Sequence, residues 1–443
     1  MQKKLFGTDG IRDLVVGETF SYLSLNSLSQ AVVNNKKNLK ILIGRDTRKS
    51  SKKIEQILVN GLKKNGAEIY LTGLISTPAI SYLTKRFNCD FGIVISASHN
   101  PYKYNGIKFF NRKGEKLSDL SEKKIEKNFF KFKNTDFKNS KKGKIKKIKN
   151  PLIIYKKKIL SDLKTKISPK KKLKIVVDCA NGSTYRMSKY IFSNKKINFI
   201  FINDKPNGRN INQKCGSMYP DRVAKEVKER SADFGISFDG DGDRIICCDE
   251  KGQIIDGDKI LACLVKYFFN KNSKKPNVII GTVMSNMGLE QFVSNLGLKF
   301  HRASVGDKFV YNLMIKKKSY IGGEQSGHII LRKFSPSGDG ILIALQLMKI
   351  ISKLTKKASD IFNLYSPYYQ IQKNIKLKDS IYSTNKEIKK ITKIYNSKTN
   401  KNFRVLIRFS GTEPVLRLLV EGKKFSRIKL LYKKLETELH KII

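Results

Sequence analysis

A short polar stretch, Ser96 to Pro101, contains residue types that could act as a nucleophile. It reads S-A-S-H-N-P and follows an apolar run at residues 93–95, which is typical of a buried strand that stops at the first serine. A hydroxyl held where a strand ends can attack a substrate or carry a phosphoryl group, and Ser98 is the candidate. An ordinary polar turn with capping serines is the alternative, and the stretch alone does not decide between them.

Three aspartates at alternate positions, Asp239, Asp241 and Asp243, follow a second strand-like run at residues 234–238. Carboxylates gathered on one turn suit a hard cation such as Mg²⁺, and without a cation they would repel one another. A calcium EF-hand is excluded, because Arg244 stands at the sixth position where that loop needs glycine and strand-like residues flank the turn. A purely structural turn is the remaining alternative, and the repulsion favours a metal site over it.

Two further motifs offer groups that could bind a sugar phosphate. Residues 320–328 read Y-I-G-G-E-Q-S-G-H, in which Glu324 and Ser326 could exchange hydrogen bonds with sugar hydroxyls and His328 could transfer protons. A single histidine is more often structural, so the role of His328 depends on its neighbours. Near the start of the chain, Arg12 follows the turn F-G-T-D-G-I, and its guanidinium is suited to gripping phosphate.

A turn near the C-terminus could hold a phosphate group. It contains Ser410, Gly411 and Thr412 and is bracketed by Arg408 and Arg417. Backbone N–H groups, two hydroxyls and two guanidiniums would together make a phosphate cradle. An ordinary β-turn with exposed arginines is the alternative.

Alternating strand and helix patterns must position these groups. Apolar runs at residues 40–43, 68–74, 91–95, 173–177, 234–238 and 278–280 predict strands, and helical spacing at 51–64 and 78–86 predicts helices between them. Such alternation indicates a largely parallel, helix-covered sheet, whose carboxyl ends are where ligands bind. Asn105-Gly106 predicts a hairpin bend that would return Lys108 toward Ser98. Strands at 404–409 and 416–420 precede a closing helix with a buried stripe of Ile428, Leu431, Leu435 and Leu439.

Size and composition indicate a soluble protein of roughly three or four domains. The 443 residues are 40% hydrophobic and 29% charged, with no secretory signal and no run long enough to span a membrane. The six cysteines show neither a metal-binding spacing nor a disulfide framework. A reducing, cytoplasmic location is therefore expected.

The chain is strongly basic, with 90 Lys and Arg against 37 Asp and Glu and a formal net charge of +53. Such a charge could bind nucleic acid, but the lysines are scattered, densest at residues 113–149 and 156–174, and no nucleic-acid motif accompanies them. Solvated lysine-rich faces are the favoured interpretation. The field would still speed the encounter with an anionic substrate.

Four motifs in order, I-S-A-S-H-N-P, D-G-D-G-D-R, G-G-E-Q-S-G-H and R-F-S-G-T-E-P-V-L-R, resemble those of the α-D-phosphohexomutases, and the resemblance spans essentially the whole chain. It implies an α/β fold of four domains around a central cleft. Three would be related α/β/α units with mixed sheets: residues 1–150 with the phosphoserine loop, 151–250 with the metal-binding loop and 251–360 with the sugar-binding loop. Residues 361–443 would form a smaller C-terminal α+β phosphate-clamp domain.

Within the family, F-G-T-D-G-I-R, T-V-M-S-N-M-G-L-E and Gln325 are most similar to members that act on glucosamine phosphates. The resemblance then implies reversible interconversion of glucosamine 6-phosphate and glucosamine 1-phosphate, which feeds UDP-N-acetylglucosamine and cell-wall synthesis. One alternative is a member of the same fold acting on glucose or mannose phosphates. The other is a basic nucleic-acid-binding protein built on a degenerate mutase.

The resemblance also implies a role for each motif residue. Ser98 would be a phosphoserine, and one Mg²⁺ would be held by that group with Asp239, Asp241 and Asp243. Arg12, Arg244 and Lys108 would supply positive charge, His99 would support the serine loop, and Lys108 and His328 would be general acid and base in an order left open. Glu324 and Ser326 would hold the sugar, and Arg408, Ser410, Gly411, Thr412 and Arg417 would hold the phosphate that is not reacting.

The implied partner is a small sugar phosphate, with glucosamine 1,6-bisphosphate as intermediate and activator, and neither a membrane nor nucleic acid is expected. The oligomeric state is left open, a homodimer included. Two departures from the family pattern stand out: Asp13 replaces the usual glycine after Arg12, and Met218-Tyr219 replaces the usual Thr-His before Pro220. Neither falls in the phosphoryl-transfer motifs.

Overall fold

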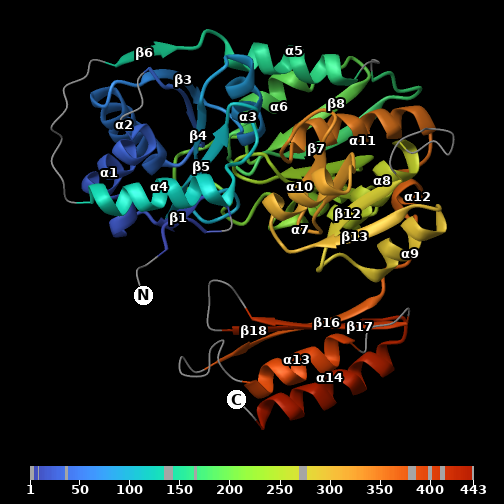
Figure 1. Cartoon of the computed structure of the whole chain (residues 1–443). Helices are drawn as coiled ribbons and strands as arrows, with labels where there is room; N and C mark the ends of the chain where they lie inside the picture. The colour runs from blue at the N-terminus through green and yellow to red at the C-terminus, as the bar shows by residue number, and fades with distance from the viewer. Residues whose placement is uncertain are drawn as a thin grey trace. The chain divides into compact units, whose positions relative to one another are not determined.

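The computed structural model describes residues 4–7, 9–34, 38–133, 143–163, 167–268, 277–377, 386–397, 402–409 and 415–441. These residues form two compact units (Figure 1). One comprises Met1–Met284 and Leu298–Leu364, and the other comprises Ser285–Gly297 and Tyr365–Ile443. The first unit contains three mixed sheets and the second contains one antiparallel sheet.

The first sheet has the strand order β1-β5-β4-β2-β3-β6. The parallel part runs from β4 to β6, whereas β5 is antiparallel to both β1 and β4. Its strands are β1 (Ile11–Leu14), β2 (Lys40–Arg45), β3 (Glu68–Leu74), β4 (Phe91–Ile95), β5 (Tyr104–Asn111) and β6 (Lys144–Lys147). Its connecting segments contain the 3₁₀-helix η1 (Glu18–Phe20) and the helices α1 (Tyr22–Val33), α2 (Lys49–Lys64), α3 (Thr77–Arg86) and α4 (Asp119–Phe132).

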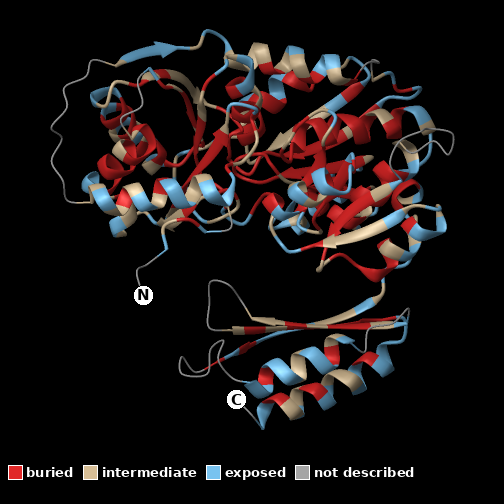
Figure 2. Ribbon diagram, viewed as in Figure 1, coloured by how far each residue is buried: buried red, intermediate tan, exposed pale blue. Residues whose placement is uncertain are grey.

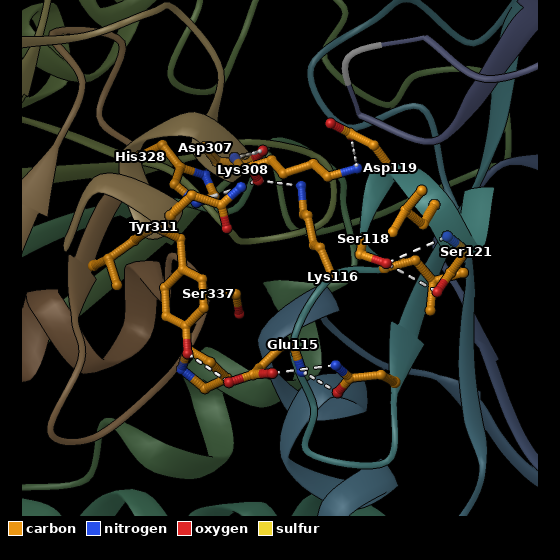
Figure 3. A pocket seen from close by; sticks show the side chains of 16 residues that line it. Glu115, Lys116, Ser118, Asp119, Ser121, Asp307, Lys308, Tyr311, His328 and Ser337 are labelled. Atoms are coloured by element: carbon orange, nitrogen blue, oxygen red, sulfur yellow. Dashed lines mark hydrogen bonds and ion pairs between the residues drawn. The ribbon is translucent and has the colours of Figure 1, made fainter. Parts of the chain in front are cut away.

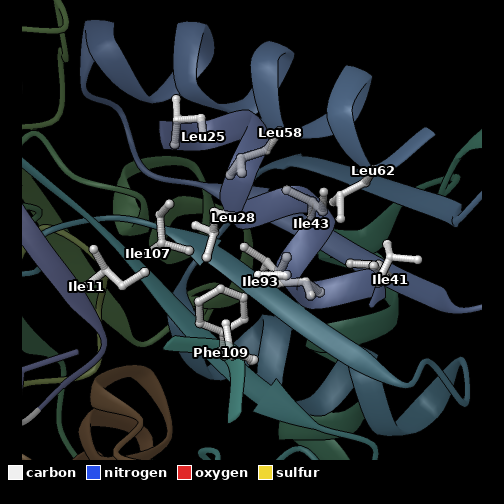
Figure 4. Packing of buried hydrophobic residues seen from close by; sticks show 14 of the residues in the cluster. Ile11, Leu25, Leu28, Ile41, Ile43, Leu58, Leu62, Ile93, Ile107 and Phe109 are labelled. Atoms are coloured by element: carbon white, nitrogen blue, oxygen red, sulfur yellow. The ribbon is translucent and has the colours of Figure 1, made fainter. Parts of the chain in front are cut away.

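Helices cover both faces of this sheet because its central strands are apolar on both sides. Ile41 and Ile43 belong to one buried cluster with Leu25 of α1 and Leu58 of α2 (Figure 4). Phe129 of α4 belongs to the same cluster. The intervening side chains of β2 and β4 point to the opposite face, where α3 contacts both strands. Burial on two faces explains why these strands read as continuous apolar runs.

The second and third sheets repeat this plan with fewer strands. Their orders are β11-β10-β9-β7-β8 and β13-β12-β14-β15. The strands are β7 (Leu173–Asp178), β8 (Ile197–Ile202), β9 (Phe234–Phe238), β10 (Ile245–Asp249), β11 (Ile254–Ile255), β12 (Val278–Thr282), β13 (Lys299–Ala303), β14 (Ile321–Gly323) and β15 (Ile329–Leu331). The helices are α5 (Pro151–Leu163), α6 (Thr184–Ile191), α7 (Pro220–Glu229), α8 (Gly257–Phe268), α10 (Asp307–Lys316), α11 (Gly340–Leu354) and α12 (Ala358–Phe362). Figure 2 shows that the central strands of these layers are buried, whereas the edge strands β8 and β13 are less so.

The three mixed sheets share one connection that explains where the polar motifs lie. In each sheet a strand that pairs in parallel on one side is followed by a loop and then by an antiparallel partner: β4 to β5, β9 to β10 and β14 to β15. The first loop carries Ser98, the second carries Asp239 and the third carries Glu324. The three motifs are thus placed at equivalent carboxyl ends of three related sheets.

The hairpin bend predicted at Asn105-Gly106 is wrong. Both residues lie inside β5, and the chain turns earlier, where Asn100 N donates to Ala97 O. The Asn105 amide donates instead to the hydroxyls of Ser50 and Ser51, at 2.8 and 3.0 Å. Gly106 lies between β1 and β4, and a Cβ there would sit 2.5 Å from Ser96 O. The Asn-Gly pair therefore serves close packing between strands and not a turn.

A Gly106→Ala substitution is expected to lower the free energy of unfolding by about 1–3 kcal/mol, because backbone atoms on both sides would have to move. Urea unfolding of the two proteins measures the loss. Gly7→Ala is the matched control, since its Cβ would meet only Gly10 O at 3.5 Å, and a change below about 0.5 kcal/mol is expected there. Equal losses in both variants would contradict the packing explanation.

The second unit is a three-stranded antiparallel sheet with helices packed on it. Its strand order is β16-β18-β17, with β16 (Tyr369–Lys376), β17 (Phe403–Phe409), β18 (Val415–Gly422), α9 (Met287–Asn295), α13 (Lys386–Ser397) and α14 (Phe425–His440). The stripe predicted for the closing helix is confirmed: Ile428, Leu435 and Leu439 are buried and Leu431 packs against the same core. Residue Glu421 ties α9 to the sheet by accepting the Met287 N–H at 2.7 Å.

Two compositional predictions can be compared with the structure. All six cysteines are buried free thiols, as expected from their spacing. Among the described residues, no helix is both long enough and apolar enough to cross a membrane.

Candidate active site

Ser98 is buried at the end of β4 with its hydroxyl against the aspartate loop. Its Oγ donates to Asp239 Oδ2 at 2.5 Å and lies 3.4 Å from His99 Nδ1. Burial, and then Arg244 and Arg12, lower the pKa of His99 to about 3, so its ring is neutral at physiological pH. The neutral ring adds no charge beside Ser98 and suits the supporting role expected of it.

The three aspartates form a compact buried group. One oxygen from each of Asp239, Asp241 and Asp243 lies within 4.8 Å of the others. Burial raises the pKa of Asp239 well above its usual value, and the carboxylates of Asp243 and Asp241 raise it further. Asp241 Oδ1 and Asp243 Oδ1 are buried without a hydrogen-bond partner. Crowded carboxylates with unpartnered oxygens fit a divalent cation with oxygen ligands.

Lys108 lies on β5 and pairs with the same aspartates. Its Nζ donates to Asp241 Oδ2 at 2.7 Å and to Asp243 Oδ2 at 2.8 Å, and the side chain is 1% exposed. Burial by itself would lower the pKa of this ammonium, but the three carboxylates of Asp241, Asp243 and Asp9 outweigh it and raise the pKa well above its usual value. The structure thus places Lys108 as a buried cation against the aspartates, with no turn at Asn105-Gly106 behind that placement.

A Lys108→Met substitution is expected to destabilise the metal-free protein by about 3–5 kcal/mol, because it leaves two buried carboxylates without their cation. Added Mg²⁺ should restore part of that loss by replacing the missing charge. Thermal unfolding with and without Mg²⁺ measures both effects. The exposed Lys113→Met should stay within about 0.5 kcal/mol of the parent protein. A Lys108→Met protein as stable as the parent would contradict the charge argument.

A chain of charged side chains connects this cluster to His328. Asp9 pairs with Arg12, Lys108 and Lys116, and Lys116 in turn pairs with Asp307. Asp307 Oδ2 lies 3.5 Å from His328 Nε2, and His328 Nδ1 lies 3.8 Å from Asp243 Oδ1. Burial lowers the pKa of His328, but Asp243 and Asp307 outweigh it and leave that pKa above its usual value. The histidine thus has charged neighbours, which its sequence context could not establish.

The sequence analysis missed three members of this chain: Asp9, Lys116 and Asp307. Asp9 had a signal, since it stands three residues before Arg12 in the same glycine-punctuated turn. Lys116 and Asp307 had none, because they are 191 residues apart and meet only in the folded chain. Asp307 begins α10, where a carboxylate is also favoured by the helix dipole.

The remaining predicted residues of the first unit lie around the same centre. Arg244 is half-buried beside the aspartates, and although desolvation lowers its pKa, Asp243 and Asp239 raise that pKa above the usual value. Glu324 is 6% exposed and its Oε1 accepts the Gly306 N–H at 2.9 Å, whereas Ser326 is exposed. Arg12 lies on β1, opposite Gly106 of β5. The structure therefore brings Arg12, Ser98, Lys108, the aspartates and His328 together.

A pocket of about 430 Å³, lined by several charged side chains, borders this centre (Figure 3). Lys116, Asp307 and His328 line it, and Figure 3 shows Tyr311 reaching Glu115 on another wall. Its charged side chains are ion-paired: Lys308, for example, lies 2.7 Å from Asp119 of the pocket wall and 2.8 Å from Glu122, which lies outside the lining. The volume would admit a molecule the size of a sugar phosphate beside His328.

In the second unit, Arg408 and Arg417 face each other across the β17–β18 pair. Burial and the neighbouring Arg417 guanidinium lower the pKa of Arg408. Two adjacent cations on one face of a sheet favour an anion between them. Ser410, Gly411 and Thr412, which complete the predicted phosphate cradle, lie outside the described residues.

A buried serine contacts a group of three buried carboxylates at the ends of repeated mixed sheets, an arrangement that is suited to phosphoryl transfer. Family models of the phosphoglucomutase/phosphomannomutase type match most of the chain: alpha/beta/alpha domain I at residues 3–136, domain II at 154–252, domain III at 256–368 and the C-terminal domain at 373–436. The chain belongs to the phosphoglucomutase/phosphomannomutase family. The four-domain α/β fold predicted from the sequence is thereby confirmed.

Two relatives are similar to this chain over almost its whole length. The chain is 43% identical over 435 residues to phosphoglucosamine mutase of Nautilia profundicola, covering 98% of both chains. It is 42% identical over 434 residues to phosphoglucosamine mutase of Caldicellulosiruptor bescii, covering 96% of both.

Solved structures show the same fold at lower sequence identity. A phosphoglucomutase/phosphomannomutase family protein from Burkholderia thailandensis matches with a TM-score of 0.83 at 21% identity, over 99% of this chain and 98% of that chain. Aspergillus fumigatus N-acetylphosphoglucosamine mutase, in complex with GlcNAc-6P and magnesium, matches with a TM-score of 0.66 at 16% identity, over 98% and 95%.

Proposed function

We propose that this protein is a phosphoglucosamine mutase, which interconverts glucosamine 6-phosphate and glucosamine 1-phosphate. The observation that carries the proposal is the contact of Ser98 Oγ with Asp239, inside a group of three buried carboxylates. The relatives of 38–43% identity, all named for this activity, support the choice of substrate. The product would feed the synthesis of UDP-N-acetylglucosamine and the cell wall, and the protein would act in the cytoplasm.

The reaction begins with a phosphoryl group on Ser98 Oγ. A free hydroxyl of the bound sugar phosphate attacks that phosphorus atom; the bond to Oγ breaks, and the sugar hydroxyl loses its proton. The resulting glucosamine 1,6-bisphosphate turns around in the site and returns its other phosphoryl group to Oγ. Mg²⁺, when bound by Asp239, Asp241 and Asp243, supplies positive charge that stabilises the transferring group.

The surrounding side chains neutralise charge, move protons and hold the substrate. Arg12, Arg244 and Lys108 face the transferring phosphoryl group, and Lys108 and His328 exchange the proton of the sugar hydroxyl. The raised pKa of Lys108 keeps its ammonium group charged, which suits the neutralisation of phosphate charge. Glu324 and Ser326 bind sugar hydroxyls in either orientation. Arg408 and Arg417, with Ser410, Gly411 and Thr412, bind the other phosphate. The proposed domains are residues 1–150, 151–250, 251–360 and 361–443.

A turnover assay of the purified protein with glucosamine, glucose and mannose phosphates tests the proposal. Glucosamine 6-phosphate should give the highest kcat/KM, and intact-mass measurement should find a species one phosphate heavier that maps to Ser98. Faster turnover of glucose 1-phosphate would move the assignment to the phosphoglucomutases of the same family. Salt-sensitive RNA binding without any mutase activity would favour a nucleic-acid function instead.

A further inference from the structure

The backbone of Ser98 adopts a left-handed conformation, and both its N–H and its carbonyl oxygen form hydrogen bonds that stabilise it. Its φ is +52°, a region that residues with side chains rarely adopt. The N–H donates to Ser96 Oγ at 3.0 Å, and the carbonyl oxygen accepts from Arg48 Nη2 at 3.0 Å and from Asn212 Nδ2 at 2.8 Å. Such a conformation persists only where the surrounding structure stabilises it, and these three hydrogen bonds stabilise the backbone of Ser98.

Arg48, which precedes α2, donates hydrogen bonds to several carbonyls of the serine loop. Its side chain is fully buried and donates to three carbonyls, those of Ser98, Asn100 and Pro101, at 3.0, 2.7 and 2.7 Å. Nε donates to Asp46 Oδ2 at 2.9 Å, which balances the charge and orients the guanidinium. The other contacts of Asp46 include the Ser96 hydroxyl at 2.7 Å, so the same carboxylate also holds the residue that binds Ser98 N–H.

Asn212 reaches the same carbonyls from the segment between β8 and α7. Its amide donates to Ser98 O at 2.8 Å and to Asn100 O at 3.0 Å. Gly240, inside the aspartate loop, packs directly over this contact: a Cβ there would lie 2.7 Å from Ser98 O and 2.8 Å from Asn212 Nδ2. The Ser98 carbonyl is therefore the point at which the serine loop and the aspartate loop are fitted together.

We propose that Arg48 and Asn212 are positioning residues for phosphoryl transfer. Among the described residues, no hydrogen bond joins either residue to the Ser98 hydroxyl or to the carboxylates of Asp239, Asp241 and Asp243. Both residues instead hold the Ser98 carbonyl, and the orientation of that backbone sets the direction of Oγ. The inference rests on the proposed function, since it assigns these residues to the transfer step at Ser98. Because they do not line the sugar site, their loss should lower kcat and leave KM for the sugar phosphate nearly unchanged.

Asn212 gives the sharpest test, because its own φ of +56° restricts the replacements. Asn212→Asp keeps the size and the tolerance of a left-handed backbone but turns the donor into a carboxylate that repels both carbonyls. Asn212→Gly keeps the backbone tolerance and removes the side chain. Lys214→Gly is the matched control in the same segment, since Lys214 is exposed and also left-handed, with φ +50°. Arg48→Lys keeps the buried charge and loses the fork.

The full-length proteins are assayed with Mg²⁺, glucosamine 6-phosphate and a hexose 1,6-bisphosphate activator, and the phosphoserine is followed by phosphorus NMR. Both Asn212 variants and Arg48→Lys should lose about 10- to 100-fold in kcat, with KM within about threefold of the parent and a shifted phosphoserine resonance. Lys214→Gly should match the parent in all three measurements.

Unchanged kcat in Asn212→Asp, or a raised KM at unchanged kcat, would overturn the inference while an active parent upholds the proposed function. A parent without turnover or phosphoserine would overturn both together. Should Asn212→Asp fail to fold, Asn212→Gly is judged by the same two criteria.

Discussion

Replacing Ser98 with alanine is expected to lower kcat/KM for glucosamine 6-phosphate by about 10⁴-fold or more, because it removes the hydroxyl that contacts Asp239 and carries the phosphoryl group in the proposed mechanism. That loss corresponds to about 5 kcal/mol of transition-state stabilisation. The same variant should lack the species one phosphate heavier that the parent shows by intact-mass measurement. Coupled assays in both directions of the reaction measure the kinetic loss.

The matched control is Ser193→Ala, which removes an exposed hydroxyl from the turn after α6. It should retain full turnover and the phosphate adduct. Folding of Ser98→Ala is checked by circular dichroism, and the backbone bonds from Ser96, Arg48 and Asn212 do not depend on the lost hydroxyl. Substantial turnover by Ser98→Ala, or an adduct that maps to another residue of the active parent, would remove the basis of the proposed mechanism.

The positions of the loops could be predicted from the sequence because apolar runs mark buried strands directly. The strand predicted at residues 91–95 is β4, and the strand at 234–238 is β9. In both cases the run is apolar on two faces and stops abruptly at the small or acidic residues of the site. The residues that start each loop were therefore visible, and Ser98 and Asp239 do meet.

The contacts that hold the loops could not be predicted, because they depend on packing between distant segments. Asn212 lies 114 residues from Ser98 and has no motif of its own. Asp46 and Arg48 were visible only as polar residues at a strand end, and nothing local showed that they would be buried as a pair. The hairpin bend predicted at Asn105-Gly106 was wrong for the same reason. The strands on either side of Gly106, and not the Asn-Gly dipeptide, decide its conformation.

Binding of Mg²⁺ should reverse the effect of pH on the stability of the parent protein. In the metal-free state burial raises the pKa of Asp239, and Asp243 and Asp241 raise it further. A folded-state pKa above the unfolded value gives stability that is fully present below about pH 4 and is lost as pH rises through the folded pKa. The contribution of Asp239 to the stability of the metal-free protein should thus fall above that pH, whereas bound Mg²⁺ makes the ionised form of Asp239 the favoured one.

An Asp239→Asn variant separates this effect from the other titrating groups. In EDTA its melting temperature relative to the parent should rise between pH 5 and pH 7.5, because the variant no longer carries the third buried carboxylate. With Mg²⁺ the order should invert, since the parent gains binding energy that the variant has lost in part, and kcat of the variant should fall at least about 100-fold. Calorimetry at both pH values, with EDTA or Mg²⁺, measures all four melting temperatures. If Mg²⁺ does not change the melting temperature of the parent, or raises that of the variant by the same amount, these aspartates do not form the metal site.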